Sequence, residues 1–472
     1  MTDAQRQVDV IVVGGGGAGM AAGLAASEAG ADVLLLEAAD ELGGATSMAI
    51  GSYSVAETPH QRAADIVDSV DAHFDDIGKF VAEAAEAGRY AGITSQRELM
   101  DRDRLDLRRL MVERGPDTFE WLRDHGLEYN GPHPEPPHRV PRMHNVQPTT
   151  DAYPEVLGDA LREAGVEVLT GTSVEDVVVE QGSVVGVRDA EGGSYRARGG
   201  IVLATGGYYA NEELRAEFTA DDRAPPVAEY GTGTGQALAH EVGAELVNMD
   251  LQSRSFRVGE PLWTSPELGD IAADGGILVT PDGDRYVNER ADHDQLFDAT
   301  LDAGGTCYVV FDGDVAETFA DWPDFLSTFP GIAYAYVDDY AETDYLVEAS
   351  TVADLAEAAG LPGDALEAAV GGYNEAARRE AVDRIGRVDF DGALDESPYY
   401  ALGPVETYAL ITDGGVAVNT RLEALDAHGA PINGLYAVGD TAGGPLRVGH
   451  GHHHLWLFNS GRTAGEEAAE AA

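Results

Sequence analysis

A glycine-rich turn near the N-terminus constrains the fold of this chain more than any other feature. An apolar run from Val8 to Val13 leads into Gly14-Gly15-Gly16-Gly17-Ala18-Gly19, and an alanine-rich stretch follows as far as Ala29. A second apolar run, Val33 to Leu36, ends in Glu37. Short apolar runs suit strands that are buried on both faces, and the stretch between them suits a helix. The segment therefore predicts a strand, helix and strand unit that carries the G-x-G-x-x-G pattern of dinucleotide-binding folds.

Each glycine of this pattern has a physical role in such a site. Gly14 permits the tight turn, Gly16 lets the backbone approach a pyrophosphate, and Gly19 lets the helix pack closely on the sheet. The helix N-terminus faces the phosphates, and Glu37 closes the second strand where a ribose hydroxyl would lie. Three spaced glycines can arise by chance in a chain with 58 of them. The strand, helix, strand and acidic residue around them indicate a dinucleotide site.

The charge of the chain excludes some partners and suggests an environment. The chain has 472 residues, room for about three packed units, and its 30 basic and 84 acidic residues give a net charge of −54. Such a chain lacks the basic surface that binds nucleic acid or anchors to anionic lipid. Lys79 is its one lysine. We expect a high-salt cytoplasm, where screening relieves self-repulsion and stability rises with salt, the alternative being an acidic mesophilic protein.

Two further absences narrow the chemistry. Cys307 is the one cysteine, which excludes an internal disulfide, a cysteine-ligated iron–sulfur cluster and a CxxCH haem attachment in this chain. The stretch from Val8 to Ala26 contains Asp9 and Gly14 to Gly17, so it predicts a soluble strand, turn and helix instead of a membrane span.

The chain changes character along its length. Helical spacing dominates from about residue 61 to 124, and a loop rich in Pro and His covers Gly131 to Pro148. Residues 253–394 mix strands and helices. The end returns to a strand and turn at Gly434 to Asp440 and a final helix from Leu455 to Ala469.

Several short blocks recur in a recognisable order along the chain. They are Gly14 to Gly19 with Glu37, Leu42 to Ser47, Ala204 to Gly207, Gly276 to Val279 running into Arg285 to Glu289, Ser397 to Ala401, Thr412 to Val416, and Gly434 to Asp440. In this order the blocks span nearly the whole chain and resemble the flavoprotein family of soluble fumarate reductases, succinate dehydrogenase flavoprotein subunits and 3-ketosteroid dehydrogenases.

The resemblance implies an α/β fold in which a Rossmann-like FAD-binding domain carries an inserted α+β capping domain. The FAD-binding domain would comprise residues 1–252 and 395–472, with a helical insertion at about 61–150, and the capping domain 253–394. It also implies non-covalent FAD, since no histidine lies in 45–55. The implied cofactor-binding residues are Gly14, Gly16, Gly17, Ala18, Gly19, Glu37, Ala38, Gly43, Gly44, Ala45, Thr46, Ser47, Val174, Ala204, Thr205, Gly206, Gly439, Asp440, Gly449, His450 and Gly451.

The implied reaction moves two hydrogens across a C–C bond beside a carbonyl or carboxylate. FAD carries the hydride, and the protein orients an anionic or carbonyl-bearing substrate and moves a proton. Electrons would be exchanged with a separate donor or acceptor. Two alternatives remain open: FAD-dependent oxidation of a C–N or C–O bond, and a non-catalytic flavoprotein that relays electrons. The residues name neither the substrate nor the direction.

Four residues are the candidates for catalysis. Arg447 lies where fumarate reductases keep a substrate-binding arginine, with an ordinary ion pair as the alternative. Arg254 lies near the position of a family histidine that binds substrate, and a domain-joining salt bridge is as reasonable. His293 stands where fumarate reductases place a proton-donating arginine, and histidine exchanges protons near neutrality. A structural histidine is the alternative there, and Arg290 could serve instead.

Two departures from the family pattern bear on the substrate pocket. Leu410-Ile411 replaces the histidine pair that precedes the Thr-x-Gly-Gly block in fumarate reductases, which favours a larger or singly charged substrate over a small dicarboxylate. The run His450-Gly451-His452-His453-His454 suggests a metal, but adjacent histidines at a helix start face different ways and no Cys or Asp-rich motif accompanies them. We expect pocket-lining roles for His450 and His452, and no metal.

Overall fold

The structure is a computed structural model that describes residues 6–86, 90, 93, 95–219, 223–259, 265–341, 343–379 and 381–472. Its largest sheet grows from the two apolar runs near the N-terminus. Five of its strands run parallel, in the order β21 (Pro431–Ala437), β9 (Ser194–Leu203), β1 (Arg6–Val13), β2 (Val33–Leu36) and β6 (Glu167–Leu169). Val13 lies opposite both Leu36 and Leu203, and Leu203 lies opposite Ala437. The register therefore brings the carboxyl ends of β1, β9 and β21 to one edge.

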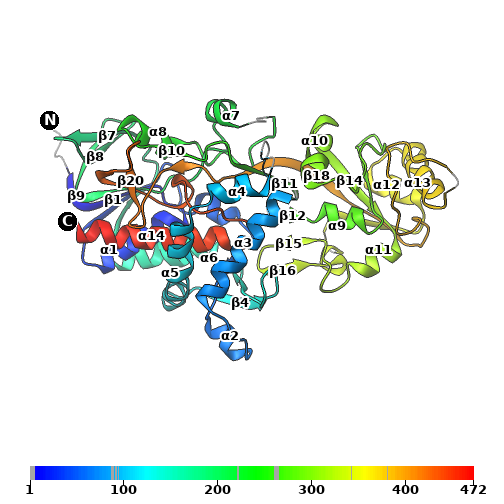
Figure 1. Cartoon of the computed structure of the whole chain (residues 1–472), viewed down its shortest axis with the longest axis horizontal. Helices are drawn as coiled ribbons and strands as arrows, with labels where there is room; N and C mark the ends of the chain where they lie inside the picture. The colour runs from blue at the N-terminus through cyan, green and yellow to red at the C-terminus, as the bar shows by residue number, and fades with distance from the viewer. Residues whose placement is uncertain are drawn as a thin grey trace.

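Antiparallel strands and helices complete this domain. The added strands are β20 (Glu423–Leu425), β7 (Val174–Glu180) and β8 (Ser183–Asp189). Helices α1 (Gly17–Glu28), α6 (Ala152–Glu163) and α14 (His452–Glu470) lie on the opposite side of the domain from β7, β8 and α8 (Thr234–Glu241) (Figure 1). α1 and α14 touch through their backbones, because Gly461 and Gly465 leave no room for a Cβ beside the carbonyl oxygens of Ala18 and Ala22. The expected strand, helix and strand unit is confirmed.

The helical insertion carries a small sheet as well as helices. The helices are α2 (Pro59–Ala63), α3 (Val70–Glu86), α4 (Gln96–Arg102) and α5 (Leu105–Asp124). The strands are β3 (Ser52–Ser54), β4 (Glu128–His133) and β5 (Met143–Gln147), paired in the order β3, β5, β4. The prediction of a loop over Gly131 to Pro148 is therefore wrong in part. The Pro and His residues of this stretch hide the alternation of apolar and polar residues that marks a strand. In addition, β5 pairs with β3, which lies about 90 residues earlier in the chain.

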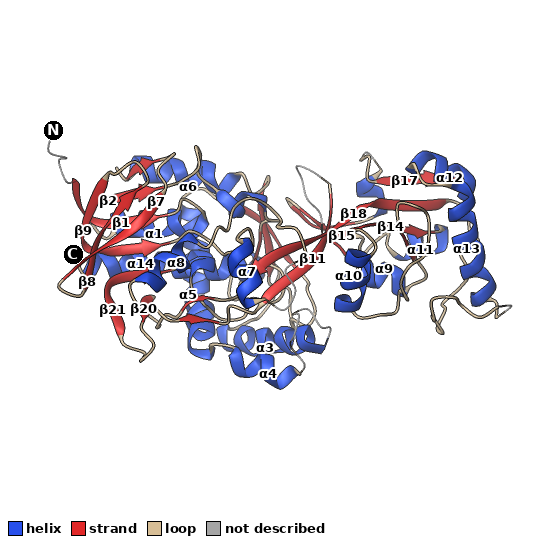
Figure 2. Ribbon diagram, turned by 90° about the horizontal axis from the view of Figure 1, so that it is seen from above, coloured by secondary structure: helices blue, strands red, loops and turns tan. Residues whose placement is uncertain are grey.

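A second sheet builds the cap at the other end of the molecule (Figure 2). Its main path is β11 (Gln252–Val258), β18 (Tyr399–Thr412), β14 (Thr306–Phe311) and β13 (Ile277–Val279), and β17 (Leu346–Ala349) also pairs with β18. The surrounding helices are α9 (Leu268–Ala273), α10 (His293–Asp302), α11 (Gly313–Thr318), α12 (Val352–Ala359) and α13 (Gly363–Ala377). This sheet has its own apolar core, separate from that of the parallel sheet. The antiparallel pair β11 and β18 links the two ends of the molecule.

A hairpin of the cap also reaches back to the helical insertion. It comprises β15 (Ser327–Phe329) and β16 (Ile332–Ala335), with β12 (Ser265–Pro266) beside it. At its tip the carbonyl oxygen of Gly331 accepts hydrogen bonds from Gln147 Nε2 at 2.8 Å and Asn130 Nδ2 at 3.1 Å. The cap therefore contacts the helical insertion through this hairpin as well as joining the rest of the chain through β11 and β18.

The remaining elements are short connections: α7 (Glu212–Phe218), β10 (Leu246–Val247), β19 (Gly415–Val416), and the 3₁₀ turns η1 (Gly44–Met48), η2 (Val337–Tyr340) and η3 (Gly439–Thr441). Within the described residues, none of the helices combines the length and the apolar character that crossing a bilayer requires.

Candidate functional site

Three strands of the parallel sheet end in glycine-containing turns at the same edge. Gly14 follows β1 with φ +105°, Gly206 follows β9 with φ +79°, and Gly439 follows β21 with φ +58°. A Cβ at Gly14 would overlap the carbonyl oxygen of Ala204, and one at Gly19 would overlap that of Gly14. Gly14 therefore makes the tight turn, and Gly19 allows the close packing, that the sequence pattern predicts for them.

Other glycines at this edge keep one side open. A Cβ on Gly16 would have its nearest neighbour 3.8 Å away, and one on Gly44 or Gly206 would meet nothing within 4 Å. α1 begins at Gly17: Gly16 has no side chain to cap the helix, Thr46 Oγ1 accepts from Gly17 N, and the first turn contains no acidic residue. Uncapped N–H groups at a helix start attract an anion. This open edge fits the pyrophosphate of FAD.

The residues expected at the adenosine end lie together. Glu37 Oε2 accepts from Gly15 N at 2.5 Å, and its Oε1 accepts from Ala39 N at 2.8 Å, so Ala38 lies between two anchored residues. Thr172 N donates to the Glu37 carbonyl at 2.8 Å, which brings the start of β7, and with it Val174, to the same end. The carboxylate holds the turn and still has lone pairs for a ribose hydroxyl.

The segment from Gly43 to Ser47 packs against the glycine turn. Gly43 N donates to Gly15 O at 3.0 Å, and Thr46 Oγ1 accepts from Gly17 N at 3.0 Å. Ala45 lies in the same 3₁₀ turn. The Ser47 hydroxyl is buried and has no hydrogen-bond partner, although burial of an unpaired hydroxyl is costly. A bound ligand could satisfy it.

Arg447 forms an ion pair at the base of this site. Its side chain is fully buried, and its guanidinium contacts Asp440 and donates from Nε to Asp413 Oδ1 at 3.0 Å. Tyr90 Oη donates to Asp413 Oδ2 at 2.6 Å. Two carboxylates thus neutralise the arginine, and the ion-pair alternative describes its surroundings. Burial raises the pKa of Asp440, and Arg447 partly offsets this effect.

The loop before α14 lies against the helical insertion. Glu135 Oε1 accepts from the backbone N of His450 at 2.7 Å and lies 2.9 Å from its Nδ1. Gly451 has φ +82° and packs on the backbone of Ser54, while Gly449 has φ +93° and packs on the ring of Phe80. α14 begins after Gly451 without a side-chain cap or an acid in its first turn.

The structure also places unpaired polar groups at this edge that the sequence analysis missed. Gln252 is buried at the start of β11, opposite Thr412, and neither of its amide atoms has a hydrogen-bond partner among the described residues. The Tyr209 hydroxyl is buried and unpaired, and burial followed by Asp440 raises its pKa. His453 Nδ1 is also unpaired, and burial followed by Arg447 lowers its pKa. Tyr209 lies two residues after the Ala204 to Gly207 block, whereas Gln252 and His453 adjoin none of the blocks.

In the cap, Arg254 and His293 belong to one cluster. Arg254 is buried and pairs with Asp294 and with Asp298, whose Oδ1 lies 2.7 Å from its Nη1. His293 begins α10, and its ring centroid lies 5.6 Å from that of Phe256. The two acidic partners of Arg254 among the described contacts, Asp294 and Asp298, both belong to α10.

Arg290 lies apart from this cluster. Its guanidinium pairs with Asp391, and both side chains are substantially exposed. Ala204 and Thr205 lie where the sequence analysis expects them, after β9, and Thr205 Oγ1 accepts from Gly235 N at 2.9 Å. Gln236 Nε2 donates to the carbonyls of Gly206 and Asp440 at 3.0 and 3.1 Å, and so ties two of the turns together.

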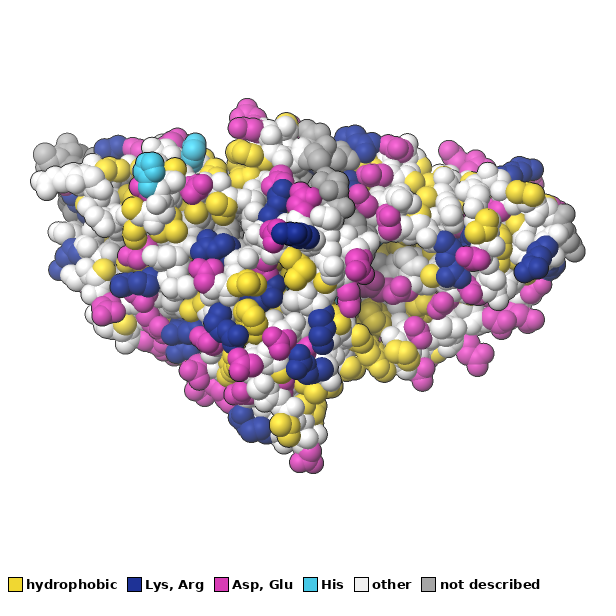
Figure 3. Space-filling view, in the orientation of Figure 1, with side chains coloured by type: hydrophobic (Ala, Val, Ile, Leu, Met, Phe, Trp, Pro, Cys, Tyr) yellow, Lys and Arg dark blue, Asp and Glu magenta, His cyan; other side chains and the backbone are white. Residues whose placement is uncertain are grey.

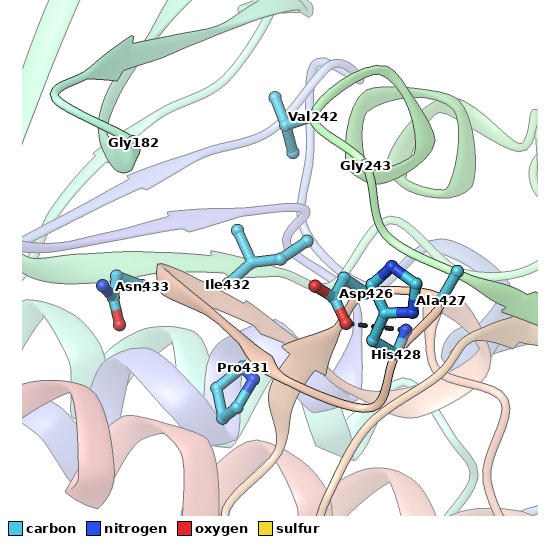
Figure 4. A pocket seen from close by; sticks show the side chains of 9 residues that line it. All are labelled: Gly182, Val242, Gly243, Asp426, Ala427, His428, Pro431, Ile432 and Asn433. Atoms are coloured by element: carbon cyan, nitrogen blue, oxygen red, sulfur yellow. Dashed lines mark hydrogen bonds between the residues drawn. The ribbon is translucent and has the colours of Figure 1, made fainter.

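A surface hollow of about 440 Å³ lies elsewhere (Figure 4). It is lined by the turn at Gly182, the end of α8 at Val242 and Gly243, and the loop from Asp426 to Asn433. β21 begins at Pro431, so the hollow lies at the amino end of this parallel strand. Ligands of such sheets bind at the carboxyl ends, and the hollow is therefore not the candidate site.

Comparison with known proteins bears on this geometry. The family model described as "FAD binding domain" matches residues 9–451. The chain is 29% identical to a probable fumarate reductase of Shewanella frigidimarina over 98% of this chain and 75% of that protein. It is 26% identical to a 3-oxosteroid 1-dehydrogenase of Mycolicibacterium smegmatis, over 93% of this chain and 92% of the other.

Some relatives are much longer than this chain. It is 29% identical to the NADH:fumarate oxidoreductase of Klebsiella pneumoniae over 99% of its own length, but spans only 48% of that protein. Among solved structures, the open conformation of a flavocytochrome c3 fumarate reductase matches with a TM-score of 0.79 and 27% identity, over 100% of this chain and 79% of the other. The expected α/β class with a capping domain is confirmed. The protein belongs to the FAD binding domain family of flavin-dependent oxidoreductases.

Proposed function

We propose that this protein moves two hydrogens across a C–C bond conjugated to a carbonyl or a single carboxylate, at the junction between the glycine edge and the cap. The supporting observation is the set of unpaired, buried donors at that junction, above all the Gln252 amide. Tyr208 N donates to Thr412 Oγ1 at 3.2 Å, which places Gln252, opposite Thr412, beside the turn that follows β9. A substrate oxygen here would recover hydrogen bonds that the protein alone leaves unmade.

The charges at the junction support a singly charged or neutral substrate. A small dicarboxylate needs several unneutralised cations. Arg447 is paired with Asp413 and Asp440, and Arg254 with Asp294 and Asp298. Neutral donors such as Gln252 and Tyr209 suit a ketone oxygen or one carboxylate. The cofactor-binding residues of the sequence analysis, from Gly14 to Gly451, are proposed in the same roles.

FAD, when bound, supplies the hydride chemistry and the route for electrons. The protein orients the substrate, excludes water and moves one proton. We assign the proton to His293, whose ring lies against Phe256 and whose helix neighbour Asp294 pairs with Arg254. Aromatic packing on one side limits the positions of the imidazole, and a positioned acid or base contributes typically about 10²–10⁴-fold to a rate. The paired strands β11 and β18 connect the cap, which holds His293, to the glycine edge.

Substitution at two cap positions tests that assignment. In the FAD-loaded protein, His293→Gln should lower kcat at least about 100-fold with an unchanged flavin spectrum. The matched control is Arg290→Gln, in the same segment but in an exposed ion pair, which should change kcat less than about threefold. Equal effects of the two substitutions would contradict the role of His293.

A photoreduction experiment tests the reaction itself. The protein is reduced anaerobically and mixed with enones, monocarboxylic enoates and fumarate, while the 450 nm region of the flavin is followed. We expect enones or monocarboxylic enoates to restore the oxidised spectrum faster than fumarate. Peroxide formation with amino acids would instead favour C–N oxidation. Reoxidation by a copurifying protein alone would favour electron relay.

The remaining expectations are proposed on the same basis. We propose a FAD-binding domain of 1–252 and 395–472 and a cap of 253–394, non-covalent FAD, and a separate electron donor or acceptor. Acid precipitation should release the flavin into the supernatant. Flavin that stays with the precipitate would contradict non-covalent binding.

We also propose a high-salt cytoplasm as the working environment. Acidic side chains are spread over both halves of the face in Figure 3, in keeping with a net charge of −54. At about 1 M salt the Debye length falls to about 3 Å, which screens repulsion between them. The melting temperature should rise from low to molar KCl. An unchanged melting temperature would refute the proposal.

A further inference from the structure

Three buried histidines from distant parts of the sequence meet beside the start of α14. His73 lies on α3, His138 in the loop between β4 and β5, and His452 is the first residue of α14. Their exposed fractions are 0, 8 and 0%. One ring nitrogen of each lies within 4.8 Å of a ring nitrogen of the other two. His73 and His138 have no role in the proposed reaction, and the ring of His452, which the sequence predicts to line the pocket, packs against the rings of Phe80 and His138.

The spacing of two of these rings suits one metal ion. His73 Nε2 lies 3.4 Å from His452 Nε2. Two nitrogens bound to a tetrahedral Zn²⁺ at about 2.0–2.1 Å are separated by roughly 3.3–3.4 Å. The nitrogen of His138 lies within 4.8 Å of the other two nitrogens, and a modest shift of its ring would bring it to the separation that Zn²⁺ requires. The cluster is therefore close to the geometry of a three-histidine centre.

The outer contacts orient His452 as a ligand. Its Nδ1 contacts the carbonyl oxygen of Val448, which only a protonated nitrogen can do favourably. The lone pair of His452 is therefore on Nε2, directed at His73. A histidine that donates from one nitrogen to a backbone carbonyl and binds through the other is the usual arrangement around metals.

The cluster also contains polar atoms that the protein leaves unpaired. His138 Nε2 and His73 Nδ1 are buried, and no hydrogen-bond partner for either lies in the described part of the chain. Among the described residues, the facing Nε2 atoms of His73 and His452 contact only each other, with the proton of His73 between them. A metal ion would bind in place of that proton, which would move to the unpaired Nδ1 of His73.

The charges around the cluster can accommodate a cation. Arg142 Nη1 lies 2.9 Å from His138 Nδ1, but Asp68 and Asp76 pair with this arginine at 2.6 Å each. Lys79 and Arg139, both half-exposed, also pair with Asp76. Glu135 adds a carboxylate whose Oε2 is buried and unpaired. The contact from Arg142 leaves the proton of His138 on Nε2, so this nitrogen binds a metal as a neutral imidazole only when the proton moves to Nδ1 and the guanidinium turns away.

We propose that His73, His138 and His452 bind one divalent transition-metal ion of the zinc type, which ties α3 to the start of α14. Imidazole nitrogen suits Zn²⁺ and its neighbours, whereas Ca²⁺ and Mg²⁺ prefer oxygen. The sequence predicts no metal, because the histidine run at 450–454 is the feature along the chain that suggests one and its adjacent histidines face different ways. The fold instead contributes one histidine from that run and two from elsewhere.

Zinc titration of the FAD-loaded full chain, after treatment with a chelator, tests the proposal. We expect one Zn²⁺ per chain, measured against a chromophoric competitor, and visible absorption bands of tetrahedral Co²⁺ on substitution. His73→Gln and His138→Gln should each weaken binding at least about 100-fold. The matched control His428→Gln, at an exposed histidine, should leave it unchanged.

Two results would overturn the proposal. One is wild-type protein that is folded and fully loaded with FAD but takes up no Zn²⁺. The other is undiminished affinity in His73→Gln, which would mean an adventitious ion only. If a variant fails to fold, as judged by circular dichroism and flavin content, the stoichiometry and Co²⁺ spectrum of the wild type decide.

Discussion

The parallel-sheet domain and the cap differ in how parts of their interiors are packed. In the former, α1 and α14 touch backbone to backbone, because Gly461 and Gly465 lie against the carbonyls of Ala18 and Ala22. In the cap, two arginines are buried in the core. Arg285 donates from Nε and Nη2 to the two carboxylate oxygens of Glu289 at 2.8 Å each.

The cap network extends to a second pair of buried charges. Arg285 Nη1 lies 2.8 Å from Asp383 Oδ1, and Arg387 Nη1 lies 3.3 Å from Glu289 Oε2. The guanidinium of Arg387 also donates to the carbonyl of Ala272 at 3.0 Å. Two cations and two anions thus balance inside the cap.

This difference indicates which changes each region tolerates. Helix contact through glycine cannot accept one added carbon, because backbone cannot move aside as a side chain can. The ion network can accept changes of shape, but each lost charge leaves its partner buried and unpaired. The contact between α1 and α14 is therefore sensitive to volume, and the ion network of the cap is sensitive to charge.

The largest expected effect is loss of charge in the cap. Glu289→Gln leaves Arg285 and Arg387 buried with one carboxylate between them, and removal of one partner of a buried pair costs about 3–5 kcal/mol. Urea denaturation followed by circular dichroism should show this loss of unfolding free energy in the cap. The flavin should be retained until the parallel-sheet domain unfolds.

The exposed pair of Arg290 and Asp391 provides the control for Glu289→Gln. Arg290→Gln should cost less than about 1 kcal/mol, because solvent screens this pair. A loss of equal size in both variants would remove the contrast between buried and exposed charge.

One added methyl group in the cofactor domain should have the next largest effect. Gly461→Ala would place a Cβ against the carbonyl of Ala18 and force α1 and α14 apart, at about 1–3 kcal/mol. The free energy of unfolding and the flavin occupancy should both fall.

A helical glycine of the cap is the matched control for Gly461→Ala. Gly371 lies in α13 and has nothing within 4 Å of the position of its Cβ. Gly371→Ala should stabilise the protein by about 0.5–1 kcal/mol, because alanine favours helix. Similar signs for the two substitutions would contradict the volume argument.

The smallest expected effect appears on acidification. Burial, followed by His60, lowers the pKa of His144 to about 3. The folded state then binds fewer protons than the unfolded state, whose histidine titrates near 6.5, so stability is complete above that pH and falls below it. Between pH 6.5 and 5 this histidine alone should cost about 2 kcal/mol.

Removing the imidazole tests that pH dependence. His144→Gln should flatten the decline of unfolding free energy between pH 6.5 and 5, measured by urea denaturation at each pH. Exposed His428→Gln should leave the decline as it is. An unaltered slope in His144→Gln would assign the acid sensitivity to other groups.

Local pattern was sufficient for the cofactor end of the molecule. The run from Val8 to Glu37 combines turn geometry, helix spacing and strand hydrophobicity, all of which act between neighbours in the chain. The tight turn at Gly14 and the close packing at Gly19 could be derived from that run and agree with the structure. The α/β class with an inserted cap came from the resemblance and is confirmed.

Contacts between distant segments decided the rest. The sequence by itself determined where the chain can turn and which strands are buried, because these depend on local sterics and apolar patterning. Only the tertiary structure showed that Arg447 is neutralised by Asp413 and Asp440, and that His452 meets His73 and His138. The charge and coordination of a buried group depend on the side chains that folding brings to it from elsewhere, and spacing along the chain carries no record of them.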